Sequence, residues 1–365
     1  MTTLVQVLRE PRLLAAASLQ DWEGLLLSAR AARLSAALGP LATAAGVLDK
    51  IPPAPRAWLA AERTRCDFVQ RQVRNEIAAI RRALGETPFP IILLKGSAYI
   101  AAELPCAPGR FLSDVDLMVP REALDEVERR LRDAGWTFDD LDDYDQRYYR
   151  DWSHELPPLT SRVRGIELDV HHNISPPVSR LKVDATRLIA DAVALGDAPW
   201  PYRGLFVLAP PDMVLHSATH LFFNDELRGG LRDVFDLHRL CEHFASVESH
   251  FYPDLVARAE ALGLDAPLWF ALTHVRHFFG TQVPEATLAA LSRRRGPISR
   301  VTWQLTRWRL DPEHQGGVAD RIALRGLILR SHWMRMPPGL LVRHAWHKAA
   351  AGTSAGLAGM FTRNE

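Results

Sequence analysis

The spacing of apolar residues divides the chain into a mixed central region and two helical flanks. From residue 56 to about residue 84, apolar side chains recur every three or four positions, which is the period of an amphipathic helix. Between residues 86 and 210 the pattern changes to short apolar runs and to alternation, which predicts β-strands. The helical period returns beyond residue 211. We therefore expect an N-terminal helical region (1–85), a core (86–210) and a C-terminal helical domain (211–365).

Four segments of the core have the composition or alternation of strands: Ile91–Leu94, Asp114–Val119, Ile166–His171 and Leu205–Leu208. Residues 161–165 resemble a hairpin turn that joins His154–Leu156 to the third of these strands. A helix is expected after Pro120, ending at Gly135.

The strand at residues 114–119 carries the first candidate chemistry. Alternate residues of a strand share a face, so Asp114 and Asp116 point the same way. Two carboxylates that close together repel each other unless a cation lies between them. Upstream, the apolar run breaks into Lys95-Gly96-Ser97, a turn whose backbone N–H groups and hydroxyl suit a phosphate. The combination indicates metal-assisted phosphoryl chemistry.

A third carboxylate is expected from the strand at residues 166–171, where Glu167, Asp169 and His171 share one face. Glu167 and Asp169 compete for this role. Such a set suits Mg²⁺, with Mn²⁺ as the alternative, because hard cations prefer oxygen ligands. For the same reason His171 is expected to orient a carboxylate or to pack.

These motifs resemble the DNA polymerase beta-like nucleotidyltransferase superfamily. More closely, Leu93–Gly96, Arg110 and Asp114–Val119 are similar to its uncharacterised bacterial nucleotidyltransferase family. The third motif of that family, an Asp followed two residues later by His, matches Asp169-Val170-His171, which favours Asp169 over Glu167.

The resemblance implies an α+β fold, with a mixed β-sheet core flanked by helical regions. It implies that Ser97 contacts a nucleotide phosphate, that Asp114 and Asp116 bind magnesium, and that Asp169 binds metal or acts as the base. The reaction would move an NMP from an NTP, with ATP favoured, to a hydroxyl of an acceptor. The acceptor is expected to be a small molecule or a peptide or protein.

Two arginines and the Lys95-Gly96 pair complete the predicted nucleotide site. Arg110 either clamps phosphates or pairs with Asp116. Arg232, in the segment from Arg228 to Asp233, either approaches phosphate as that segment closes or forms a surface pair.

His216 and His220 lie four apart on a predicted helix. A packed or hydrogen-bonded helix face is preferred to a zinc site, because a third ligand and the HExxH order are both missing.

Composition limits the partners of the protein. The 365 residues carry a net charge of +1, which implies no global attraction to nucleic acid or anionic membranes. The region from residue 293 to residue 348 is locally basic and rich in tryptophan; this suits RNA, a lipid surface or simply a helical core. Three widely spaced cysteines, the absence of a signal peptide and the absence of a long apolar run predict a cytoplasmic protein without a membrane span.

Two alternative functions remain from the sequence. One is a non-catalytic protein of the same fold that binds a nucleotide or a partner. The other is a nucleotidyltransferase that modifies RNA through its basic C-terminal region.

Overall fold

A seven-stranded mixed sheet lies at the centre of the computed structural model, which describes residues 2–138, 148–223, 227, 229–293, 295–335, 337, 339 and 341. The strand order is β3-β4-β5-β2-β1-β7-β6. The strands are β1 (Ile92–Leu93), β2 (Asp114–Met118), β3 (Trp136–Phe138), β4 (Leu159–Ser161), β5 (Glu167–His171), β6 (Val193–Ala194) and β7 (Phe206–Val207). The two central neighbours β2 and β5 are parallel, whereas β1 is antiparallel to β2 and parallel to β7. The α+β fold with a mixed sheet is confirmed.

The predicted hairpin is confirmed, but two prolines divide its first arm. β4 pairs with β5 in the antiparallel sense, and the N–H of Gly165 donates to the carbonyl of Ser161 in the turn. Upstream of Pro157 and Pro158, pairing resumes as a single bridge between Glu155 and His171. Proline has no N–H to donate, so the strand is interrupted between the two paired parts.

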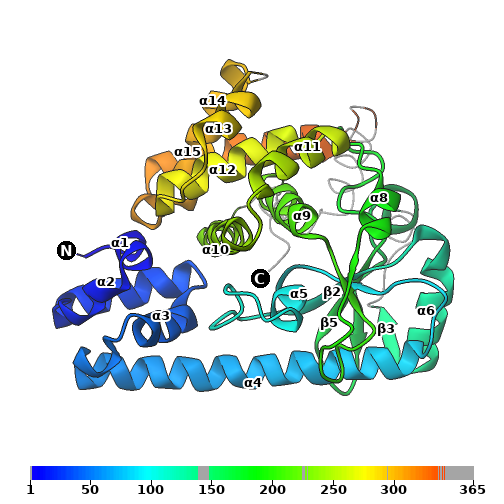
Figure 1. Cartoon of the computed structure of the whole chain (residues 1–365), viewed down its shortest axis with the longest axis horizontal. Coiled ribbons are helices and arrows are strands. Elements are labelled where there is room, and N and C mark those ends of the chain that lie inside the picture. Colours follow the sequence, from blue (N-terminus) through cyan, green and yellow to red (C-terminus); the bar gives the residue numbers. More distant parts are fainter. Residues whose placement is uncertain are drawn as a thin grey trace, which may run out of the picture.

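The N-terminal helices pack on one end of a long helix, α4, whose other end lies beside the sheet (Figure 1). They are α1 (Leu4–Arg9), α2 (Leu19–Ala31), α3 (Leu38–Ala44), α4 (Pro53–Leu84) and the short 3₁₀ helices η1 (Pro11–Ala15), η2 (Ser35–Ala37) and η3 (Leu48–Lys50). Prolines fit the first turn of α4, where no N–H bond is lost, and Gly85 ends it with a positive φ of 58°. With 32 residues, α4 is about 48 Å long, which lets it contact both the N-terminal helices and β2.

Two helices belong to the core: α5 (Lys95–Ala101), which follows β1 directly, and α6 (Leu124–Asp133), which begins after the 3₁₀ turn η4 (Arg121–Ala123). The helix expected after Pro120 is therefore confirmed. A π-helical turn, η5 (Tyr148–Trp152), and α8 (Ala185–Ala190) lie in the connections.

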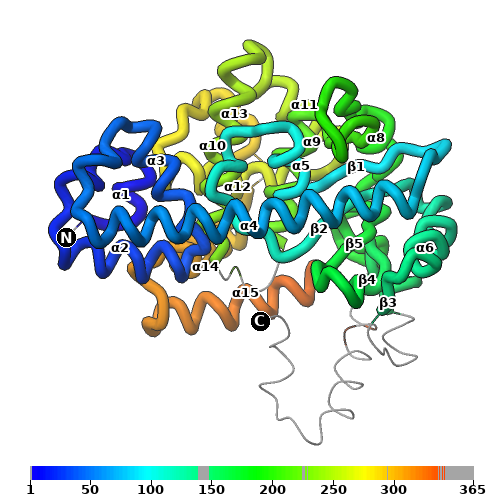
Figure 2. Tube along the Cα trace, turned by 90° about the horizontal axis from the view of Figure 1, so that it is seen from below, coloured from blue at the N-terminus to red at the C-terminus, as the bar shows by residue number. Residues whose placement is uncertain are grey.

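The C-terminal half is helical, as the apolar period predicts. Its elements are α9 (Pro210–Phe223), α10 (Leu231–Val247), α11 (Phe251–Leu262), α12 (Asp265–Phe279), α13 (Glu285–Ser292), α14 (Pro297–Leu310), η6 (Pro312–His314) and α15 (Val318–Arg335). α9 packs on α10, α11 and α12 and also contacts α5, so the C-terminal helices cover the edge of the core where α5 begins. Figure 2 shows α15 running along one side of the molecule from the N-terminal helices towards β4 and β5.

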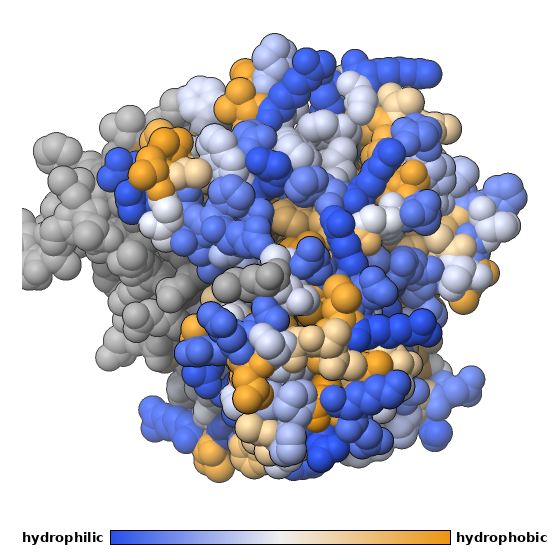
Figure 3. Space-filling view, turned by 90° about the vertical axis from the view of Figure 1, so that its left-hand side faces the viewer, coloured by the Kyte–Doolittle hydropathy of each residue, from blue (hydrophilic) through white to orange (hydrophobic). Residues whose placement is uncertain are grey.

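One continuous cluster of buried apolar side chains extends from Leu4 to Leu327 and joins the three parts of the chain. At the end of the molecule that carries α1–α3, surface apolar residues form separate small patches between polar ones (Figure 3). No helix in the described part of the chain is both long enough and apolar enough to cross a membrane.

Candidate active site

Three carboxylates meet on one face of the two central strands. In the parallel register of β2 and β5, Asp116 lies directly opposite Asp169, and Asp114 lies opposite Glu167. The alternate residues of both strands, such as Val115 and Leu168, are buried. Because side chains alternate along a strand, burying one face places the acidic residues of both strands on the other.

Asp116 is held by two cationic or polar partners. Its Oδ1 accepts a hydrogen bond from Lys95 Nζ at 2.7 Å and lies 3.0 Å from His171 Nε2. Burial alone would raise the pKa of Asp116, but Lys95 and His171 outweigh it and hold the pKa well below its usual range. Asp116 is therefore an ionised, fixed carboxylate. The prediction that His171 orients a carboxylate agrees with this contact.

Asp169 lacks such a partner. Burial, together with the neighbouring charges of Asp116 and Glu155, raises the pKa of Asp169 to about 9. Its Oδ1 is buried and accepts no hydrogen bond from the described residues. The pKa of Asp114 is also raised, first by burial and then by Asp116. An oxygen buried next to other carboxylates with no donor is the arrangement expected where a cation binds.

The donor set fits a divalent cation. One ligand atom each from Asp116, Asp169 and His171 lie within 4.8 Å of one another. The carboxylate oxygens of Asp114, Asp116 and Asp169 are hard ligands of the type that Mg²⁺ binds. The structure therefore brings together all three predicted carboxylates, and places Asp169 rather than Glu167 opposite Asp116.

The turn after β1 is tightly constrained. Lys95 has a positive φ of 46°, which costs a non-glycine residue about 1 kcal/mol and places its side chain against Asp116. A Cβ on Gly96 would lie 2.8 Å from Arg110 Nε, so glycine is required for this close approach. Ser97 is buried, and its Oγ has no hydrogen-bond partner among the described residues.

Arg110 does not pair with Asp116. Its buried guanidinium forms ion pairs with Asp236 and, at 3.8 Å, with Asp233, and it lies over the ring of Tyr99. Asp116 already has Lys95 and His171 as partners, so Arg110 pairs with other carboxylates. Both acidic partners of Arg110 belong to α10, so the arginine joins the core to the C-terminal helices.

Arg232 lies at the start of α10 and near the carboxylates. Its Nη2 is 3.0 Å from Asp233 Oδ1, and its charge works to lower the pKa of Asp114. The Arg232–Asp233 pair is thus present but partly buried, on a helix that faces the site. Arg228, which begins the predicted closing segment, lies outside the described residues.

Sequence reasoning missed an acidic residue beside His171. Glu155 Oε2 is 3.1 Å from His171 Nδ1, and His154 stacks at a tilt on the same ring. His171 therefore bridges Glu155 and Asp116. The predicted hairpin could have revealed this contact, because it brings residues 154–156 alongside His171.

Two histidines of α9 also face the carboxylates, a role that was not predicted. His216 is buried, whereas His220 is exposed. The charge of Lys95 lowers the pKa of His220 to about 3, so this ring is neutral. The structure places these histidines near the carboxylates as uncharged neighbours.

The basic C-terminal region is described only in part, since Arg294 and the residues after 341 lie outside the described residues. Trp303 is partly buried against His274 and His277. Trp333 is half exposed, with the guanidinium of Arg180 stacked 4.1 Å from its ring. The tryptophans thus serve both in packing and at the surface.

Comparison with protein families places this site in context. The model of a family described as uncharacterised nucleotidyltransferase matches residues 18–280. The chain belongs to this uncharacterised nucleotidyltransferase family. The match covers the whole sheet, the carboxylates and α9 to α12. No curated protein and no solved structure matches the chain. Family membership implies transferase activity with an NTP as substrate.

Proposed function

We propose that the protein is a magnesium-dependent nucleotidyltransferase that moves an NMP from an NTP, with ATP favoured, to a hydroxyl of a small molecule or a peptide. The observation that carries this proposal is the register of β2 and β5, which puts Asp116 opposite Asp169 with Asp114 beside them. Family membership supports the reaction class. An intact set of three carboxylates also favours a catalytic protein over a non-catalytic one of the same fold.

Asp114, Asp116 and Asp169 would hold the metal. Bound there, one or two Mg²⁺ ions would stabilise charge on the triphosphate and on the leaving pyrophosphate. Asp116 is the most strongly ionised of the three, because Lys95 and His171 both stabilise its charge. Glu155 holds His171 from the other side, and this contact fixes the ring against Asp116.

Asp169 would bind metal or accept the proton of the acceptor hydroxyl. Its pKa of about 9 in the absence of a cation shows a strong tendency to hold a proton in this environment. Lys95 neutralises the carboxylates in the metal-free protein. With a cation held by the carboxylates, the ammonium group of Lys95 would be available to a triphosphate oxygen.

Thermal unfolding in the presence of nucleotides tests this function. Each of the four NTPs is added with Mg²⁺ and with EDTA to the wild type, to Asp114→Ala and to Asp133→Asn, an exposed α6 control. A ligand present at about 100 times its Kd stabilises the folded state by about 2.7 kcal/mol, which raises the melting temperature by several degrees. We expect this rise only with Mg²⁺, and only in the wild type and the control. If no NTP stabilises the wild type, the proposed function is wrong.

A further inference from the structure

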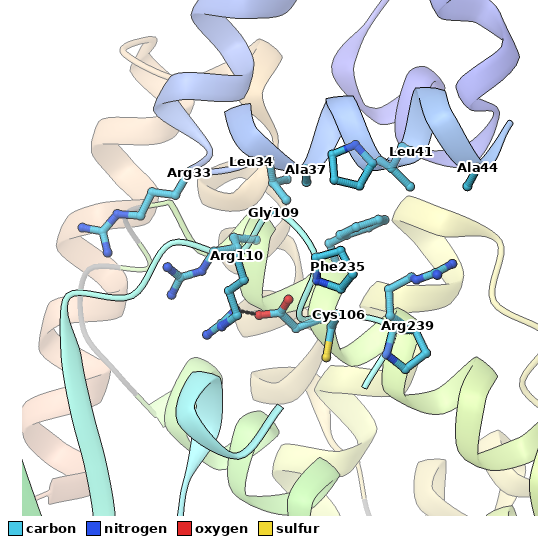
Figure 4. Close-up of a pocket in the computed structure, with 15 residues that line it drawn as sticks. Arg33, Leu34, Ala37, Leu41, Ala44, Cys106, Gly109, Arg110, Phe235 and Arg239 are labelled. Carbon is cyan, nitrogen blue, oxygen red and sulfur yellow. Dashed lines mark ion pairs between the residues drawn. The ribbon is translucent and has the colours of Figure 1, made fainter. Parts of the chain in front are cut away.

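A cavity separate from the carboxylates lies where the N-terminal helices meet the core and α10 (Figure 4). Its volume is about 130 Å³. One wall comes from η2 and α3, including Leu34, Ala37 and Leu41. The opposite wall comes from Phe235 of α10 and from the loop between α5 and β2, including Gly109. Ligand sites often form at such junctions between parts of a chain.

The loop wall of the cavity is built for close packing. Gly109 has a positive φ of 76°, and a Cβ there would lie 2.4 Å from the carbonyl oxygen of Ala36. The loop therefore contacts η2 through backbone alone, which fixes the distance between the two walls. The close contact of Gly109 with η2 thus helps to define the cavity.

The charged groups of the lining are mostly arginines. Arg110 is paired with Asp236, and Arg232 is paired with Asp233, so these two arginines are neutralised. The other two arginines of the lining are Arg33 and Arg239.

Figure 4 shows Arg33 and Arg239 on opposite sides of the cavity, with the guanidinium of Arg33 directed outward at the exposed rim. Arg33 forms no ion pair with any residue in the described ranges, and Arg239 has only Glu242 at 3.9 Å. Asp236 is the one acidic residue in the lining, and Arg110 already neutralises it. The lining as a whole is therefore positive, with an apolar middle.

The volume sets the size of a ligand. A cavity of about 150 Å³ accommodates benzene in another protein, so this cavity suits an apolar body of about six heavy atoms. A guanidinium at either end would pair with a carboxylate or a phosphate. The chemistry that fits is thus a small organic anion with an apolar body.

One side of the cavity lies towards the carboxylate site. Arg110 lines the cavity, and its Nε packs against Gly96, the residue after Lys95. Arg232 also lines the cavity while acting on the pKa of Asp114. Arg110 and Arg232 thus form the side of the cavity that faces the carboxylates.

We propose that this cavity binds the anionic part of the acceptor, a carboxylate or phosphate joined to a small apolar body. The assignment to the acceptor rests on the proposed nucleotidyl transfer, whereas the ligand class rests on the cavity alone. The nucleotide would bind separately, at the carboxylates.

Ligand-detected NMR titration tests the ligand class with benzoate, phenyl phosphate and the neutral analogue benzyl alcohol. We expect at least one anion to saturate the wild type with an affinity about tenfold above that of the alcohol, as one charge-assisted hydrogen bond provides. The tighter anion identifies the acidic group. Equal binding of the alcohol, or no saturation by either anion up to about 20 mM, overturns the proposal.

Variants locate the binding. Arg33→Gln and Arg239→Gln should each weaken the anion, and Ala44→Glu, at an exposed position of the rim, should abolish binding by adding bulk and negative charge. Arg71→Gln, an exposed arginine of α4 outside the lining, is the matched control and should bind as the wild type does. Unchanged binding in Ala44→Glu with a native melting temperature would show that the anion binds elsewhere, against the proposal.

Two further arms separate this proposal from the proposed function. Asp114→Ala should keep the anion, since it leaves the cavity intact. Saturating Mg-ATP should leave anion affinity within about twofold, whereas competition would assign the cavity to the nucleotide and overturn the acceptor site. If the anion binds and no NTP does, the nucleotidyltransferase function fails while the anion site stands.

Discussion

Asp169→Asn tests the electrostatics of the carboxylate cluster without any substrate. In the folded, metal-free protein Asp169 keeps its proton up to a pKa of about 9, whereas the unfolded chain releases it near the ordinary value of 3.8. Between these limits the unfolded state binds fewer protons than the folded state. The free energy of unfolding therefore falls as the pH rises, by at most about 1.4 kcal/mol per pH unit. Asparagine at position 169 cannot titrate but keeps the shape of the side chain.

The expected magnitude follows from that slope. From pH 5 to pH 7 the limit for one proton is about 2.7 kcal/mol, and sharing of protons with Asp114 lowers it to about 1–2 kcal/mol. Asp169→Asn should thus gain stability relative to the wild type by this amount across the interval. Urea unfolding in EDTA at pH 5, 6, 7 and 8 measures the difference.

The control is Glu167→Gln, the exposed carboxylate two residues earlier on the same strand face. Adding Mg²⁺ should stabilise the wild type and Glu167→Gln but not Asp169→Asn. A pH-independent difference for Asp169→Asn, or loss of the Mg²⁺ effect in Glu167→Gln, would refute the assignment of the third carboxylate.

Three other substitutions test the structure. Lys95→Met leaves Asp116 without its closest cation and should lower the free energy of unfolding in urea by about 3 kcal/mol at pH 7. This loss should shrink below about pH 4, where Asp116 of the unfolded chain becomes protonated. Equal losses at pH 7 and below about pH 4 would contradict the ion pair. Glu76→Ala removes the acceptor of the buried indole N–H of Trp136 and of the guanidinium of Arg164. It should lower the free energy of unfolding by about 3–5 kcal/mol in the same assay. A loss under about 1 kcal/mol would contradict these hydrogen bonds. Gly109→Ala places a Cβ against the backbone of Ala36 at a residue with positive φ. It should lower the free energy of unfolding by at least about 2 kcal/mol more than Gly46→Ala, where φ is also positive but nothing lies nearby. Equal losses of the two variants by calorimetry would contradict the close contact.

Local pattern predicted the long helices and the strands that carry the acidic residues, but not β3 or β6. Alternation along residues 114–119 placed Asp114 and Asp116 on one face, and the apolar period with Gly85 at its end defined α4. These features depend on the geometry of one segment, so the sequence of that segment determines them. The competition between Glu167 and Asp169 could not be resolved locally, because it depends on the register between two strands 50 residues apart.

Only the tertiary structure decided which groups meet. The parallel register put Asp169 opposite Asp116, and packing of α10 against the core gave Arg110 its acidic partners. Contacts of this kind join segments that are distant in sequence, and burial then changes their charges, as it does for Asp169. The cavity at Arg33 and Arg239 arises in the same way, from three parts of the chain none of which is a site by itself. Sequence by itself determined the reaction class, whereas long-range packing decided which acidic residue lies opposite Asp116, the partners of the arginines and the position of the cavity.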